Sequence, residues 1–206
     1  MTISATAGGA PPMTFREHME RAAAQTLAAF PDEHVPQIHC VTFRIDGVDQ
    51  DPRHPYLAIG YSTEADVAAL LASPHPPEAW EARWSYAYFP PTGLEGVRSV
   101  GSDPVGAGLH RREAVRQGLW YEDDDGLSED ERDERGERLD ERFHRLCVDV
   151  AKGLHAGGHI REALGRPVPV ILYDMFNPDE MFALSRAANP PELVADFLAE
   201  DPEGRD

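Results

Sequence analysis

Apolar residues recur every three or four positions in five stretches of the chain, a spacing that places side chains on one face of a helix. With their flanking residues, these stretches cover positions 14–31, 62–74, 109–121, 128–157 and 189–200. Two of them open with a capping box, Thr14 to Glu17 and Ser128 to Glu131, in which a hydroxyl and a carboxylate satisfy the first free amides. A short helical turn is also expected at Trp80.

Other segments follow the two-residue period of strands. Residues 38–45 and 56–61 alternate around the turn dipeptide Asp46-Gly47 and predict an antiparallel pair. Residues 84–89 alternate aromatic and small side chains and predict a third strand, followed by a loop from residue 92 to 108. Residues 168–173 are apolar without alternation, which is typical of a fully buried strand, although Pro169 argues against a central position at its start.

These elements predict an α+β fold with one domain, a mostly antiparallel sheet of four to six strands and four or five flanking helices. The domain is expected to span residues 13–200, in three layers if the 168–173 strand is central. Residues 1–12 are expected to be a disordered segment, 122–138 an acidic loop and helix extension, and 201–206 an acidic tail.

Charge narrows the classes of partner. The chain has 19 Lys and Arg against 37 Asp and Glu, a net charge of −18, which disfavours nucleic acid and anionic membranes. Residues 122–142 alone carry 12 acids and 4 arginines, a net of −8. Pairs of opposite charge four residues apart, such as Glu131 with Arg135, Glu134 with Arg138 and Glu141 with Arg145, predict a helix that projects into water. The N-terminus lacks the pattern of a secretory signal, so we expect a cytoplasmic protein.

Familiar catalytic and metal-binding motifs are missing from the sequence. Cys40 and Cys147 are expected to be small buried residues, and neighbouring positions on a strand place His39 and Cys40 on opposite faces. His155 and His159 have helical spacing, but glycines lie between them, and the acidic run 122–126 lacks the ligand pattern of a calcium loop. We therefore predict no metal and no cofactor.

The order of several short sequences resembles a bacterial family known as domain of unknown function 4303. The segments that carry the resemblance are Ile59-Gly60-Tyr61-Ser62-Thr63-Glu64, Glu81-Ala82-Arg83-Trp84-Ser85-Tyr86, Gly157-Gly158, Asp174, Leu184-Ser185 and Asn189-Pro190. The resemblance covers roughly residues 13–200, with the acidic insertion 122–138 atypical. It implies an immunity-type protein of a bacterial toxin system and supplies no catalytic residue.

Two hypotheses of function follow. The first is an acidic interaction protein that neutralises a cationic protein partner, with acids to steer the partner and aromatics to hold it. Its predicted binding residues are Glu122, Asp123, Asp124, Asp125, Glu129, Glu134, Trp84 and Tyr86. The second is an enzyme whose site is assembled from distant residues in a cleft under the 90–108 loop. Its candidate residues are His39, His110, His144, Asp174 and Glu180. A homodimer held by an apolar helix face is a third alternative.

Overall fold

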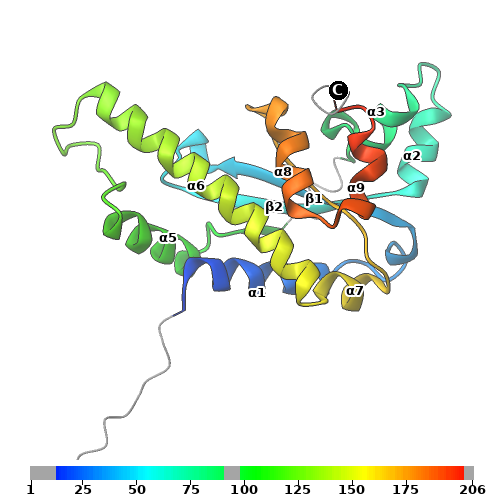
Figure 1. Cartoon of the computed structure of the whole chain (residues 1–206), viewed down its shortest axis with the longest axis horizontal. Coiled ribbons are helices and arrows are strands. Elements are labelled where there is room, and N and C mark those ends of the chain that lie inside the picture. The colour runs from blue at the N-terminus through cyan, green and yellow to red at the C-terminus, as the bar shows by residue number, and fades with distance from the viewer. Residues whose placement is uncertain (1–12, 91–97, 202–206) are drawn as a thin grey trace, which may run out of the picture.

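The computed structural model describes residues 13–90 and 98–201 (Figure 1). Its α-helices are α1 (Phe15–Leu27), α2 (Glu64–Leu71), α3 (Ala79–Trp84), α5 (Pro104–Arg116), α6 (Glu129–Ala156), α7 (His159–Leu164), α8 (Met181–Ala188) and α9 (Pro191–Leu198). Its strands are β1 (Ile38–Gly47), β2 (Pro55–Thr63), β3 (Arg98–Val100) and β4 (Val170–Asp174). Short 3-10 turns are η1 (Val35–Gln37), η2 (Val48–Gln50), η3 (Tyr86–Tyr88) and η4 (Pro178–Glu180). The α+β class is confirmed.

The four strands form one mixed sheet in the order β3-β2-β1-β4. β1 pairs with β2 in the predicted antiparallel arrangement, with Phe43 opposite Ile59, and β2 pairs antiparallel with β3. β4 runs parallel to β1, with Leu172 opposite Phe43. β4 is fully buried, as predicted for this segment. It lies at the edge of the sheet and not at its centre.

Helices cover both faces of this sheet. One face carries Val41, Phe43 and Leu172, which pack against α1, α5, α6 and α7 in the larger core cluster. Tyr173 and Ile171 point to the opposite face, where α3, α8 and α9 form a second cluster. Figure 1 shows the long helix α6 running diagonally across the sheet, with α1 beside its C-terminal half and α8 between α6 and α9.

Side chains of α8 and of the residue after it complete the outer edge of β4. Asn189 accepts a hydrogen bond from the Val170 amide at 2.7 Å and donates one to the Val170 carbonyl at 2.7 Å. One turn earlier, Ser185 accepts from the Leu172 amide at 3.0 Å and donates to the Leu172 carbonyl at 3.3 Å. These residues replace a neighbouring strand, which explains how an edge strand can be buried without leaving its backbone groups unsatisfied.

Both capping boxes are confirmed at α1 and α6, and a third forms at α2, where Thr63 is the capping residue. The predicted strand at 84–89 is wrong: Trp84 ends α3, and Tyr86–Tyr88 form η3. The region predicted as loop, 92–108, instead contains β3 and the start of α5, which Asp103 caps; residues 91–97 lie outside the described part. Helices α7 and α8 were not predicted.

The structure also differs from the sequence predictions at His39 and Cys40 and at Asp201. At a register shift between Ile38 and Cys40, His39 packs on Trp84, which belongs to the same core cluster as Cys40, so the two neighbours do not face opposite sides at this bulge as expected. At the C-terminus, Asp201 is 2% exposed and pairs with Arg186, although the predicted acidic tail included it; residues 202–206 lie outside the described part. Both cysteines are buried and free, as expected, and burial raises the pKa of each thiol.

The role of Ser185 can be tested by replacing it with alanine, which removes both partners of the buried Leu172 peptide groups. We expect Ser185→Ala to lower the free energy of unfolding by about 2–3 kcal/mol, because unsatisfied buried backbone groups are costly. Urea denaturation measures the change, and Ser102→Ala, at an exposed serine, is the matched control. Equal stability of the two variants would show that the hydroxyl does not support the edge of β4.

Candidate functional site

A cluster of ionisable side chains forms where α6 passes β4 and η4. His144 projects from α6, Asp174 is the last residue of β4, and Glu180 is the last residue of η4. α6 carries His144 next to Phe143 and one turn before Cys147 and Val148, so the apolar stripe that anchors the helix also turns the imidazole inward. His144 is 8% exposed and Asp174 is 7% exposed, so both are largely removed from water.

The hydrogen bonds of His144 define which nitrogen is basic. Its Nδ1 lies 2.8 Å from the backbone carbonyl of Asp140, which can only accept, so Nδ1 carries a proton. Its Nε2 lies 3.3 Å from Asp174 Oδ2 and 4.0 Å from Glu180 Oε2 but makes no hydrogen bond with favourable geometry. The neutral ring therefore presents a buried lone pair at Nε2, beside two carboxylates.

The charges of the cluster shift one another's pKa values. Burial alone would lower the pKa of His144, but Asp174, the Asp140 carbonyl and Glu180 together raise it above the ordinary value of 6.5. Although burial opposes it, the charge of the nearby His144 imidazole and hydrogen bonds from the Phe176 amide and the Asn177 side chain lower the pKa of Asp174. Burial and the neighbouring carboxylates Asp174 and Asp51 raise the pKa of Asp140.

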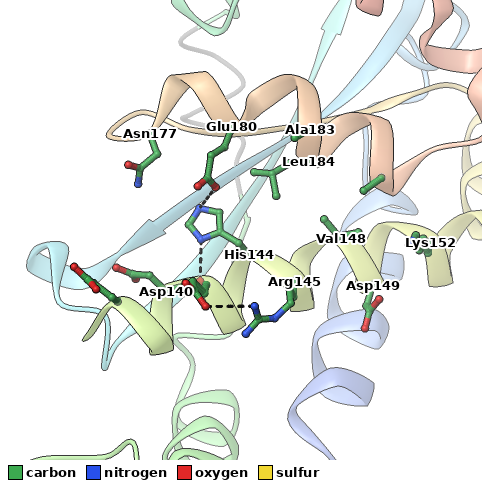
Figure 2. Close-up of a pocket in the computed structure, with 13 residues that line it drawn as sticks. Asp140, His144, Arg145, Val148, Asp149, Lys152, Asn177, Glu180, Ala183 and Leu184 are labelled. Atoms are coloured by element: carbon green, nitrogen blue, oxygen red, sulfur yellow. Dashed lines mark hydrogen bonds and ion pairs between the residues drawn. The ribbon is translucent and has the colours of Figure 1, made fainter. Parts of the chain in front are cut away.

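Two hollows meet at this cluster. The wider one is a cleft of about 780 Å³ between α6 and the η4–α8 segment. Figure 2 shows His144 in this cleft between Glu180 above it and Asp140 below it, with Arg145 and Lys152 farther along α6. The smaller one is a cavity of about 260 Å³ on the other side of the imidazole. Asp140, His144 and Asn177 line both hollows.

The smaller cavity is bordered by a segment with unusual backbone geometry. Asp49 and Gln50, in η2, have φ angles of 55° and 60°, a left-handed conformation that side chains other than glycine seldom adopt. Gln50 lines the cavity together with Asp46, Asp51 and the exposed Phe176. A backbone conformation of this kind costs free energy and persists only where the surrounding structure holds it. Such residues are found often at functional sites.

Three of the five residues proposed for a dispersed enzyme site are thus brought together: His144, Asp174 and Glu180. The other two are elsewhere. His39 packs on Trp84 and His110 on Phe15, and burial lowers the pKa of each to about 4. The cluster also lies by the β1–β2 connection, whereas the expectation placed it under the 90–108 loop.

Sequence reasoning missed Asp140, Asn177 and Gln50. Asp140 and His144 are four residues apart on a helix, a spacing that could have linked them. Asn177 and Gln50 lie in connections whose path no local pattern predicts.

The predicted acidic binding residues divide into two groups. Glu122 pairs with Arg111, Asp123 with Arg53, and Asp125 lies 3.8 Å from Arg132, so these loop carboxylates are partly neutralised. Asp124, Glu129 and Glu134 are exposed, and within residues 13–90 and 98–201 no arginine or lysine nitrogen lies within 4.0 Å of their carboxylates. Of the three ion pairs predicted along α6, only Glu141 with Arg145 forms, at 3.4 Å. Arg135 instead donates to the Trp120 carbonyl.

The two predicted aromatic binding residues face inward. Trp84 is 5% exposed and packs edge-on against Phe197, so it offers a partner no surface. Tyr86 is half-buried and stacks on Tyr173 with ring centres 5.4 Å apart. Two large apolar side chains directly after Asp174 are exposed instead: Met175, 49% exposed, and Phe176, 61% exposed, in the β4–η4 connection.

Across the described residues, no group of three or more His, Cys, Asp or Glu side chains is arranged to hold a metal ion. His155 bonds to the Asn189 side chain at 3.0 Å and belongs to the network at the β4 edge, apart from His159, which is exposed. None of the helices in the described ranges is both long and apolar enough to cross a lipid bilayer.

The pH dependence of stability tests the His144 contacts. A raised pKa in the folded protein means that protonated His144 stabilises the fold fully below pH 6.5 and that this contribution is lost as pH rises through the folded pKa. We expect His144→Gln to cost more stability at about pH 5.5 than at about pH 8.5, in urea denaturation.

His75→Gln, at an exposed loop position, is the control. The lowered pKa values of His39 and His110 act in the opposite direction, but they are common to both proteins and cancel in the difference. A cost of His144→Gln that does not change with pH would contradict the contacts described above.

Comparisons of the chain with protein-family models, with curated proteins and with solved structures found no match. The resemblance to domain of unknown function 4303 therefore stays a prediction. What can be said of function rests on the arrangement of residues around α6: a row of exposed carboxylates on its N-terminal half, and a buried imidazole with two carboxylates where it meets β4 and η4.

Proposed function

We propose that this protein binds a cationic protein partner through the N-terminal half of α6. The observation that carries the proposal is the set of exposed carboxylates on this half of the helix that lack a cationic neighbour. This set, the α6 acidic face, consists of Glu129, Asp130, Asp133, Glu134 and Glu137. In the described part of the chain, no arginine or lysine nitrogen lies within 4.0 Å of any of them.

The arginines of this region support the proposal by where they point. Arg132 and Arg135 donate to backbone carbonyls of residues 123 and 120, and Arg142 pairs with Glu113 at 2.7 Å. They tie the helix to the segment before it. Arg138, on the same half of the helix, is exposed, and no carboxylate oxygen of the described residues lies within 4.0 Å of its guanidinium, so the outward carboxylates form no ion pair. Negative charge that is not paired internally speeds encounter with a positively charged partner.

The ion pairs and the exposure of individual side chains reduce the set of binding residues predicted from the sequence. Glu122, Asp123 and Asp125 already have arginine partners, so they contribute less to the attraction than the α6 acidic face. Met175 and Phe176 take the place that Trp84 and Tyr86 had in the sequence hypothesis, because they are exposed and directly follow Asp174 in the chain. An immunity-type role, a cytoplasmic location and a homodimer remain proposals that follow from the sequence alone.

The proposal is tested by removing charge from the α6 acidic face. The variant carries Glu129→Gln, Asp133→Asn, Glu134→Gln and Glu137→Gln, and the control carries Glu33→Gln, Glu162→Gln, Glu192→Gln and Asp196→Asn, all at exposed positions. Each immobilised protein is incubated with a lysate of the cells that make it, at about 50 mM and about 500 mM salt. Retained proteins are identified, purified and titrated against both variants.

We expect a basic protein to be retained at low salt and released at high salt. We expect the α6 variant to bind it about tenfold more weakly, because the variant loses four of the negative charges that attract the partner. The control variant, with the same net charge, is expected to bind as the wild type does. Retention of no basic protein at low salt, or equal loss in both variants, would refute a specific acidic interface.

A proton-transfer enzyme is a second candidate function, favoured by the convergence of His144, Asp174 and Glu180 at the cleft. With Nδ1 fixed by the Asp140 carbonyl, Nε2 is placed to accept a proton, as a general base requires. If a substrate screen finds an activity, we expect His144→Gln to abolish it and the α6 acidic-face variant to keep it. The reverse pattern would exclude this site as its source.

A further inference from the structure

The cavity of about 260 Å³ beside His144 has the composition of a pocket for one cationic side chain. Four carboxylate residues line it, Asp46, Asp51, Asp140 and Asp174, and no arginine or lysine does so within the described residues. Its volume is below that of most sites for whole small molecules, which favours a single inserted group. The charge of the lining excludes anions such as phosphate.

Not all of these carboxylates are available to a ligand. Asp46 lies 3.5 Å from an Arg44 nitrogen, and Asp51 lies 2.6 Å from Arg53. Asp140, in contrast, has no hydrogen bond or ion pair from its carboxylate to any described residue, although it is partly desolvated and close to other carboxylates. Asp174 is held by the Phe176 amide and the Asn177 side chain, with His144 as its nearest cationic group.

A second observation, independent of the acids, also points to a ligand. The Nε2 atom of His144 is buried and makes no hydrogen bond; its nearest polar atoms, Asp174 Oδ2 at 3.3 Å and Glu180 Oε2 at 4.0 Å, attract it only when the ring is protonated, and the side chain is 8% exposed and lines the cavity. A buried nitrogen without a hydrogen-bond partner is uncommon in a folded protein and costs free energy. In the neutral ring this atom is an acceptor, like the carboxylates of Asp140 and Asp174 beside it, and no described side chain donates a hydrogen bond to Nε2 or to the Asp140 carboxylate.

We propose that this cavity receives the guanidinium group of an arginine of the partner, between the carboxylates of Asp140 and Asp174. A guanidinium has five N–H donors and no acceptor, which complements two carboxylates and the Nε2 lone pair. Its flat face can lie against Phe176, which is 61% exposed at the rim. The inference rests on the proposed function, because it names the side chain by which a cationic partner is recognised.

The His144 proton then competes with the ligand. Protonation at Nε2 removes an acceptor and adds a positive charge, so binding is expected to be tighter at about pH 8.5 than at about pH 6. The groups that set this proton's affinity are the backbone carbonyl of Asp140 on the same helix, Asp174 from β4 and Glu180 from η4; Asp46 and Asp51 also line the cavity.

The experiment uses N-acetyl-arginine amide as the probe and follows the backbone amides of the full chain by NMR. Its neutral analogue, N-acetyl-citrulline amide, has nearly the same shape. We expect arginine, but not citrulline, to shift the signals of Gln50, Phe176 and Asn177. Asp140→Asn is expected to weaken the arginine probe by roughly tenfold, because a hydrogen bond to a charged group is lost. Glu192→Gln, on α9, is the control, and both variants are first checked for wild-type stability.

Equal shifts with both probes, shifts confined to other surfaces, or unchanged binding by Asp140→Asn would overturn the pocket. So would N-acetyl-lysine amide binding as tightly as the arginine probe, because it would remove the role of the guanidinium. These results leave the α6 charge experiment unaffected. Conversely, arginine binding in this cavity by a chain that retains no basic protein would confirm the pocket and refute the protein-binding function.

Discussion

The hydrogen bonds from Ser185 and Asn189 to β4 are the constraint on which the rest of the structure depends. Because they satisfy the open edge of the strand, β4 can be buried along its whole length and still end at Asp174 inside the fold. The same bonds fix α8 against the sheet, and α8 in turn holds η4 and Glu180 over His144. Two polar side chains thus set how the end of β4 and the turn η4 lie relative to each other, and α6 adds His144 to them.

Local signals in the sequence predicted much of the fold. Thr14 and Ser128 cap their helices as expected, because a capping box involves only neighbouring residues. The alternation of residues 38–45 and 56–61 also predicts the β1–β2 pair correctly. Residues 84–89 mislead because their aromatics alternate for a different reason: Trp84 fills a core and Tyr86 covers Tyr173. Packing across the sheet decided that segment, and no local pattern carries this information.

The candidate site was predictable only as a collection of residue types. His144, Asp174 and Glu180 are far apart in the chain, and their meeting depends on β4 lying parallel to β1 and next to α8. The sequence shows where the acidic residues are, but it does not show which of them form ion pairs. Only the structure separates Asp123, which is paired with Arg53, from Glu129 and Glu134, which have no such partner among the described residues. Composition gives the total charge, whereas the proposed function depends on the carboxylates that form no ion pair.

The two free cysteines have a consequence for experiments on this protein. Cys147 lies in the core cluster on one face of the sheet and Cys40 in the cluster on the other. Burial keeps both thiols protonated, so neither reacts readily with alkylating reagents while the fold is intact. Each cysteine is therefore a native chemical reporter for one layer of helices, and the order in which the two become labelled under mild denaturant would reveal which layer opens first.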